Sequence, residues 1–239
     1  MPDTVLDVEN VETSYGDFSV SGIDLHLQSG DIFGLMGKSG SGKSTVIETL
    51  LGLKQPDTGT ITVRIDGEEC PINTAVGYSP QENSLYPFLS IAENLETFGR
   101  LQDIDSQDIQ ERREQLLSML NIREAQDKRV TSLSGGMKKR ADLAATLLHD
   151  PQIVILDEPF TGIDPPQRDI IWQALQQLAR DDKIIIVTSH MLHDLQQHCN
   201  KYGLIYHGDF LHTEEIASMM ENNNYRNFQT FLRDVFRRK

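Results

Sequence analysis

The sequence contains little cysteine and little basic charge. Its 239 residues include only two cysteines, Cys70 and Cys199, without a neighbouring Cys or His at metal-ligand spacing. This disfavours a disulfide framework and a zinc site, and it fits a reducing compartment. The 22 Lys and Arg residues are dispersed and stand against 36 Asp and Glu, a formal net charge of -14. Because such a chain repels phosphates, we expect no nucleic-acid partner.

Long apolar runs are also missing. No apolar stretch approaches the ~18 residues needed to cross a bilayer, and Met1–Thr4 does not begin a signal peptide. We therefore expect a soluble chain that reaches a membrane only through a partner. Hydrophobic residues still make up 38% of the chain, enough for a packed core. The length suits one α/β domain with an inserted subdomain.

Two kinds of strand pattern occur. Apolar residues alternate in Ile23–Leu27 and in Ile61–Ile65, which precedes an Asp66-Gly67 turn. This period predicts strands of a partly exposed, antiparallel sheet. Other short segments are continuously apolar, which predicts the buried strands of a parallel sheet. These segments are Ile32–Phe33, Ile153–Leu156 and Ile184–Val187.

The middle of the chain is helical in character. Ser90 and Glu93 form a capping-box pattern, and apolar residues between Leu95 and Leu120 recur at helical spacing. We predict a mainly helical subdomain over residues 83–150. A further helix is expected after Asp164, where two prolines suit the first turn.

The end of the chain predicts an amphipathic helix over residues 225–239. Its apolar residues follow helical spacing, and arginines supply a basic surface beside them. The apolar residues are Phe228, Phe231, Leu232, Val235 and Phe236, and the arginines are Arg226, Arg233, Arg237 and Arg238. We expect this helix to pack on the domain or on a partner, with binding to a membrane surface as the alternative.

A glycine-rich segment matches the phosphate-binding loop pattern between an apolar strand and a helix-compatible segment. Backbone N–H groups of such a loop surround phosphate oxygens, and the helix that follows adds its positive dipole end. Lys43 would reach the terminal phosphates and Ser44 could bind Mg²⁺. A nucleoside triphosphate is the predicted ligand. The loop consists of Gly37, Lys38, Ser39, Gly40, Ser41, Gly42, Lys43, Ser44 and Thr45.

Two further segments carry chemistry. Asp157 and Glu158 end the apolar strand Ile153–Leu156, at the sheet edge where an open α/β fold binds phosphates. We expect Asp157 to help hold hydrated Mg²⁺ and Glu158 to polarise an attacking water. Ser134, with the N–H groups of Gly135 and Gly136, forms a second helix start that suits an anion.

In their order along the chain, the segments GKSGSGKST, Gln81, LSGGM, ILDEP and TSH resemble those of ABC ATPases. The resemblance covers nearly the whole chain and is weakest after about residue 215. It implies a single α/β domain over residues 1–239: a P-loop NTPase core with a mainly parallel sheet, an antiparallel β subdomain and the helical insertion. ATP and Mg²⁺ are the implied cofactors.

The resemblance also implies roles for individual residues. Gln81 is similar to the glutamine that senses Mg²⁺ and the attacking water, Asp164 to a residue that communicates across a dimer, and His190 to the switch residue near the γ-phosphate. Ser134 and Gly136 resemble residues that contact ATP held by another subunit. Taken singly, Gln81 also suits a surface loop, Asp164 a helix N-cap and His190 a strand end; the ordered set favours the functional roles.

Three positions are less specific to the family. Tyr15 resembles the aromatic residue that stacks on adenine, although an aromatic beside a turn is also common in packing. Met137 stands where many members have Gln, and with the basic residues that follow it resembles the exporter branch. Lys38 lies where a neutral residue is common, and we expect it to point to solvent because Lys43 already supplies the ammonium.

The sequence therefore predicts an ATP hydrolase whose dimer closure drives translocation, by export, through separate transmembrane permease subunits. Two copies, or one copy and a homologous ATPase subunit, would sandwich two ATP molecules at the cytoplasmic face of a membrane. A non-transport ABC ATPase is the first alternative, although the long insertion or second cassette usual there is missing. A regulatory module without turnover is the second alternative, which Glu158 and His190 disfavour. The transported substrate is not indicated.

Overall fold

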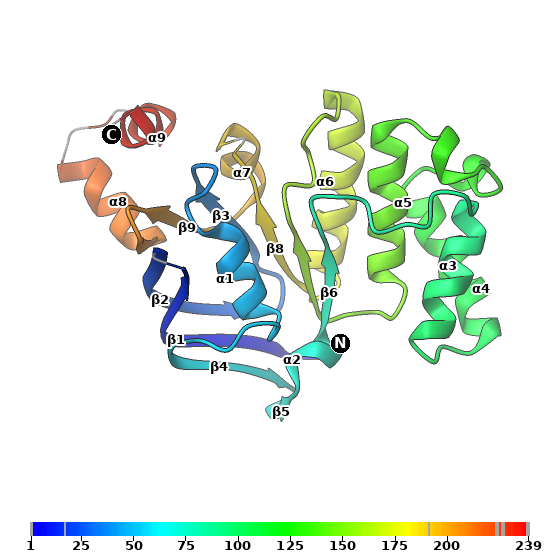
Figure 1. The fold of residues 1–239 in the computed structure, drawn as a ribbon, viewed down its shortest axis with the longest axis horizontal. Helices are drawn as coiled ribbons and strands as arrows, with labels where there is room; N and C mark the ends of the chain where they lie inside the picture. Colours follow the sequence, from blue (N-terminus) through cyan, green and yellow to red (C-terminus); the bar gives the residue numbers. More distant parts are fainter. Residues whose placement is uncertain (1, 17, 191, 223–224, 226–227, 238–239) are drawn as a thin grey trace.

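The computed structural model describes residues 2–16, 18–190, 192–222, 225 and 228–237. Within this part of the chain, strands and helices alternate as in an α/β protein (Figure 1). The strands are β1 (Thr4–Tyr15), β2 (Phe18–Gln28), β3 (Ile32–Gly37), β4 (Thr58–Ile65), β5 (Glu68–Cys70), β6 (Val76–Ser79), β7 (Ile153–Leu156), β8 (Ile184–Thr188), β9 (Lys201–Tyr206) and β10 (Asp209–His212). The helices are α1 (Lys43–Leu50), α2 (Ile72–Ala75), α3 (Ile91–Leu101), α4 (Ser106–Met119), α5 (Gly135–Leu147), α6 (Pro165–Arg180), α7 (Leu192–His198), α8 (Thr213–Asn222) and α9 (Phe228–Arg237).

The strands form one sheet in the order β5-β4-β1-β2-β10-β9-β3-β8-β7-β6. The five strands from β9 to β6 are parallel, and all residues of β7 and β8 are buried, as their continuous apolar pattern predicts. At the other end, β1, β2, β4 and β5 pair antiparallel. Between β4 and β5, Asp66 and Gly67 have φ of 53° and 83°, the conformation of a tight hairpin turn. The predicted division into a parallel core and an antiparallel part is therefore confirmed.

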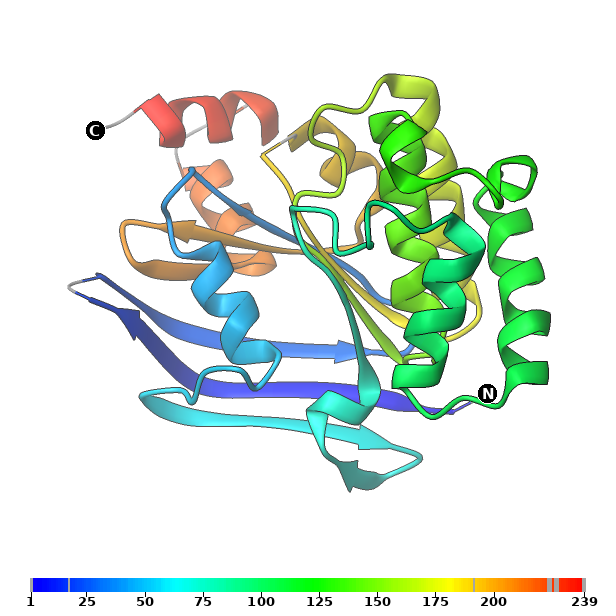
Figure 2. The same cartoon turned by 45° about the vertical axis from the view of Figure 1, so that its right-hand side comes forward.

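Helices α3, α4 and α5 lie together beside the β6 edge of the sheet (Figures 1 and 2). The predicted capping box is confirmed, because Ser90 Oγ accepts from Glu93 N at 3.1 Å and Glu93 Oε2 accepts from Ser90 N at 2.7 Å. These hydrogen bonds lower the pKa of the Glu93 carboxyl. Leu95 and Leu120 are fully buried in one cluster that also contains residues of α5 and α6. The helical insertion is thus joined to the parallel core by apolar packing.

The tail helix α9 packs against α7. Phe231 and Leu232 are 0% exposed and Val235 is 5% exposed, and all three belong to the large core cluster. These three residues therefore pack on the chain's own domain. The side chains of Phe228, Phe236 and the four tail arginines lie outside the described residues. In the part of the chain that the structure describes, no helix is both long and apolar enough to span a bilayer.

Replacing Phe231 by Ala is expected to lower the free energy of unfolding by about 3 kcal/mol, because it empties a buried aromatic site. Urea unfolding followed by circular dichroism measures this change. Glu221→Ala on the neighbouring exposed surface of α8 is the control and should leave the unfolding midpoint unchanged. Equal midpoints for both variants would contradict the packing of α9. Tight binding of the wild-type chain to anionic vesicles, lost on truncation after Tyr225, would instead favour the membrane-surface alternative.

Candidate active site

A cavity of about 710 Å³ lies where β3, β6, β7 and β8 end. Parallel strands bring their carboxyl ends to one edge, so segments far apart in the sequence meet there. Most residues expected at the nucleotide line this cavity, and Phe18 and Thr161 join them. The lining residues are Tyr15, Phe18, Ser39, Gly40, Gly42, Lys43, Ser44, Thr45, Gln81, Asp157, Glu158, Thr161 and His190.

The loop between β3 and α1 depends on glycine at its last position before the helix. Gly42 has φ of 98°, and a Cβ there would lie 2.6 Å from Phe18 Cε1 and 2.7 Å from Val20 Cγ2. The residue must therefore be glycine, both for its backbone conformation and for space. Gly42 is also the N-cap of α1 and supplies no side-chain hydrogen bond, so the first N–H groups of the helix are left for another acceptor.

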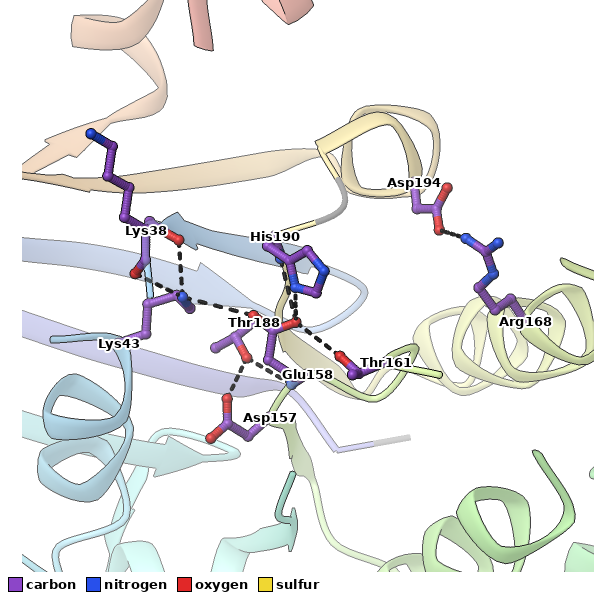
Figure 3. A network of polar contacts seen from close by, with 10 residues as sticks. Lys38, Lys43, Asp157, Glu158, Thr161, Arg168, Thr188, His190 and Asp194 are labelled. Atoms are coloured by element: carbon purple, nitrogen blue, oxygen red, sulfur yellow. Dashed lines mark hydrogen bonds and ion pairs between the residues drawn. The ribbon is translucent and has the colours of Figure 1, made fainter. Parts of the chain in front are cut away.

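Lys43 is held at the floor of this loop. Its Nζ donates to the carbonyl oxygens of Gly37 at 2.9 Å and Lys38 at 3.2 Å. The Lys38 side chain is exposed and directed away from Lys43 and Glu158, as expected (Figure 3). Lys38 and Ser41 line a neighbouring cavity of about 200 Å³ instead of the main one. Gly37 lies on neither cavity; a Cβ there would collide with the Ser41 hydroxyl.

Glu158 connects the loop lysine with the histidine after β8. Its Oε1 lies 3.7 Å from Lys43 Nζ, and its Oε2 lies 2.7 Å from His190 Nδ1 (Figure 3). Thr161 Oγ1 donates to the same Oε2 at 3.5 Å. The Glu158 backbone has φ of 47°, a conformation uncommon for residues other than glycine and often found at functional sites. The carboxylate is therefore held in one place between a cation and an imidazole.

Thr188, the last residue of β8, holds both acidic residues. Its Oγ1 donates to Asp157 Oδ1 at 2.6 Å and accepts from Glu158 N at 2.8 Å. Sequence reasoning gave Thr188 no role, although a buried hydroxyl residue that ends an apolar strand was a usable signal. Phe18 was missed too; it pairs with Tyr15 across the β1–β2 hairpin and lies on the cavity. Tyr15 is 75% exposed, so its ring is open to a ligand.

The oxygen donors on the cavity suit Mg²⁺. Ser44, Gln81 and Asp157 all line it. Among the described residues, no group of three or more His, Cys, Asp or Glu side chains could hold a metal ion by itself. A small donor set completed by phosphate oxygens and water is the mode in which Mg²⁺ usually binds. The residues present therefore fit Mg²⁺ bound together with a nucleotide.

The remaining predicted residues lie away from the cavity. Ser134 is the N-cap of α5, where its Oγ accepts from Met137 N at 3.3 Å, and Gly135 follows it on the surface. Gly136 is buried, and a Cβ there would lie 3.1 Å from the Gln167 side chain. Asp164 is the N-cap residue of α6, as its sequence context predicts, but its side chain makes no capping hydrogen bond. Within this chain, these residues therefore do not complete the cavity.

Comparison with known proteins agrees with this arrangement. Residues 20–161 match the family described as ABC transporter. The chain is 37% identical over 214 residues to Nod factor export ATP-binding protein I of Paraburkholderia xenovorans, covering 87% of this chain and 70% of that protein. It is 35% identical over 211 residues to linearmycin resistance ATP-binding protein LnrL of Bacillus subtilis, covering 87% of this chain and 68% of that protein.

Solved structures show the same fold. An ATP-binding subunit of an ABC transporter superposes with a TM-score of 0.82 at 20% identity, covering 97% of this chain and 99% of the other. The cbiO1 component of the Clostridium perfringens cbiONQ transporter complex gives a TM-score of 0.78 at 24% identity, covering 96% of this chain and 98% of the other. Because the family match spans more than half of the chain and the relatives share more than a third of the aligned residues, the chain belongs to the ABC transporter family as an ATP-binding subunit, an ATPase coupled to transport.

Proposed function

We propose that this chain hydrolyses MgATP as one half of an ATPase pair that drives an ABC exporter. One observation carries the proposal: the phosphate-binding loop, Gln81, the acidic pair and His190 converge on one cavity. The names of the relatives, Nod factor export and linearmycin resistance, support export. So does Met137, which a run of basic residues follows. Permease subunits would hold the pair at the cytoplasmic face of a membrane.

In the proposed reaction, the chain binds the phosphates through the N–H groups at the start of α1 and through Lys43. Lys43 Nζ now donates to two loop carbonyls, and these weak partners can be exchanged for phosphate oxygens. Ser44, Gln81 and Asp157 would hold Mg²⁺, which neutralises charge on the phosphates. Tyr15, which is open to solvent beside the loop, would stack on the adenine ring.

Glu158 is the proposed general base or water-orienting residue. Its carboxylate is fixed by His190 and Thr161 and faces the cavity beside Lys43. A group fixed in this way can orient an attacking water in line with the terminal phosphate, which is most of what phosphoryl transfer requires of a protein. His190 Nδ1 is now hydrogen-bonded to Glu158 Oε2, the oxygen that Thr161 also contacts. When ATP binds, His190 would exchange this partner for the terminal phosphate.

The site is proposed to need a second subunit. Ser134 and Gly136 offer the N-terminus of α5 to an anion, yet they lie away from this chain's own cavity. A second copy, or a homologous ATPase, would bring its own Ser134-like segment onto the nucleotide held here. Asp164 at the start of α6 would lie between the two sites and communicate their state.

Mixing two inactive variants tests this composite site. Lys43→Ala removes the phosphate lysine, and Ser134→Arg blocks the α5 N-terminus, so each pure dimer should be inactive. In a mixed dimer, one site combines an intact loop with an intact Ser134 segment. We expect mixing to restore roughly a quarter of the wild-type ATPase rate, because half of the dimers are mixed and each has one working site.

The control for this experiment is Ser132→Arg, which places the same bulk two residues earlier on the exposed surface. It should keep wild-type ATPase activity. A fully active Ser134→Arg variant would contradict the role of this segment. Mixed dimers that form and stay inactive would contradict the composite site itself.

A further inference from the structure

Helix α5 carries a buried acid that the proposed mechanism does not use. Asp142 is 0% exposed. Its Oδ2 accepts from Ser79 Oγ at 2.6 Å, and its Oδ1 accepts from Ser84 N at 2.9 Å and also from Ser84 Oγ. A buried carboxylate is costly unless such hydrogen bonds satisfy it. All three of these donors belong to two residues of one short segment.

That segment contains Gln81. Ser79 is the last residue of β6, and Ser84 lies three residues beyond Gln81, so the two contacts enclose it on both sides. One turn before Asp142 on α5, Lys139 Nζ donates to the carbonyl oxygen of Pro80 at 2.5 Å. Burial lowers the pKa of the Lys139 ammonium, while Asp142 and Asp157 oppose this change. Helix α5 therefore holds the Gln81 segment at three points, Ser79, Pro80 and Ser84.

The same segment is tied to the acidic pair. The carbonyl oxygen of Ser79 accepts from Asp157 N at 2.9 Å, in addition to the side-chain contact with Asp142. Helix α5 begins directly after its N-cap residue Ser134, about two turns before Asp142. One helix thus links the Ser134 segment, which does not line this cavity, with the segment that brings Gln81 to it.

Stabilisation of the fold explains these contacts less well than positioning of the Gln81 segment does. Replacing buried charged groups by apolar ones of similar size is often neutral for stability, so the core does not require an acid and a lysine here. Elsewhere α5 contacts its neighbours through apolar residues such as Ala141 and through the buried Arg140, whose guanidinium donates to two backbone carbonyl oxygens just after α4. The buried charges of Asp142 and Lys139 are directed instead at the residues on either side of Gln81.

We propose that Asp142 and Lys139 are positioning residues that set Gln81 at the catalytic cavity and make its position follow that of α5. The proposal rests on the proposed function, because it assigns Gln81 a part in hydrolysis. When the Ser134 end of α5 contacts the nucleotide of a second subunit, a shift of α5 would then change the position of Gln81. Asp142 acts on the reaction through Gln81 and does not touch the nucleotide.

A double-mutant cycle between Asp142 and Gln81 tests the proposal on the full chain with its transport partners. Asp142→Ala should lower kcat about tenfold and leave the KM for ATP within about twofold, because the phosphate loop is untouched. Gln81→Ala should lower kcat about 30-fold. If Asp142 acts through Gln81, the double variant is also slowed about 30-fold, whereas independent effects would multiply to about 300-fold.

Thr146→Ala is the matched control. Thr146 is also buried, one turn further along α5, and its hydroxyl donates to the backbone carbonyl oxygens of Asp142 and Tyr78 but makes no hydrogen bond to residues 79–84. It should lower the thermal midpoint by an amount similar to Asp142→Ala while keeping the wild-type kcat. A Thr146→Ala variant that loses kcat as strongly as Asp142→Ala would overturn the proposal, because general loosening of α5 would then explain both.

The remaining outcomes separate this proposal from the proposed function. A Gln81→Ala variant with wild-type turnover would remove Gln81 from the proposed mechanism. A slow Gln81→Ala variant combined with multiplied losses in the double variant would overturn only the positioning role. If Asp142→Ala does not fold, the cycle is run with Ser84→Ala at the surface, where a loss of about threefold is expected to vanish in the Gln81→Ala background. Full additivity there would overturn the proposal as well.

Discussion

The Lys43→Ala variant is expected to lose ATP hydrolysis by at least about 100-fold and to bind ATP more weakly. Lys43 Nζ lies on the floor of the phosphate-binding loop, 2.9 Å from the Gly37 carbonyl oxygen. Its removal takes away the counter-charge for the terminal phosphates, and it also leaves Glu158 without its nearest cation. The fold should survive, because the change removes no apolar packing from the core.

Steady-state phosphate release and equilibrium binding of a fluorescent ATP analogue measure these two effects. Lys54→Ala is the control, since Lys54 follows α1, is only partly buried and does not line the cavity. Circular dichroism checks that the Lys43 variant is folded. Wild-type ATP affinity together with wild-type turnover in Lys43→Ala would contradict the assignment of the phosphate-binding loop.

The Glu158→Gln variant is expected to bind MgATP, to form a long-lived closed dimer and to release phosphate at least about 100-fold more slowly. The amide keeps the size of the side chain and can still hydrogen-bond to Thr161 and His190, so the cavity should keep its shape. It lacks the carboxylate that orients or activates water. Lys43 would still bind the phosphates, and Ser134 of a second subunit would still complete the site. The closed dimer of the variant should therefore last longer than that of the wild type.

Size-exclusion chromatography in MgATP, run beside a phosphate-release assay, measures both consequences. Glu124→Gln provides the control, because Glu124 is exposed and lies away from the cavity. Hydrolysis at the wild-type rate would remove Glu158 from the catalytic role. An inactive variant that stays monomeric with bound ATP would contradict a self-paired dimer and indicate that a different ATPase subunit is the partner.

The sequence by itself determined the parts that depend on local chemistry. The apolar runs of β7 and β8, the Asp66-Gly67 turn and the Ser90 capping box each follow from neighbouring residues, and the structure contains all of them. The glycine-rich loop was also predictable, since its conformation depends on glycine within a few positions. The order of this loop and the other motifs along the chain then indicated the family, and the family in turn indicated the residues that converge on the cavity.

Only the tertiary structure decided which side chains support that site from a distance. Thr188 reaches Asp157 across 31 residues, and Asp142 reaches Ser79 across 63, because β7 lies between β6 and β8 and α5 packs beside β6. Position 42 must be glycine partly because Phe18, which is distant in the sequence, lies where a Cβ would be. Such contacts leave no periodic pattern in the sequence, since they arise from the order of strands in the sheet, and a serine or threonine in the sequence does not show which buried carboxylate it will meet.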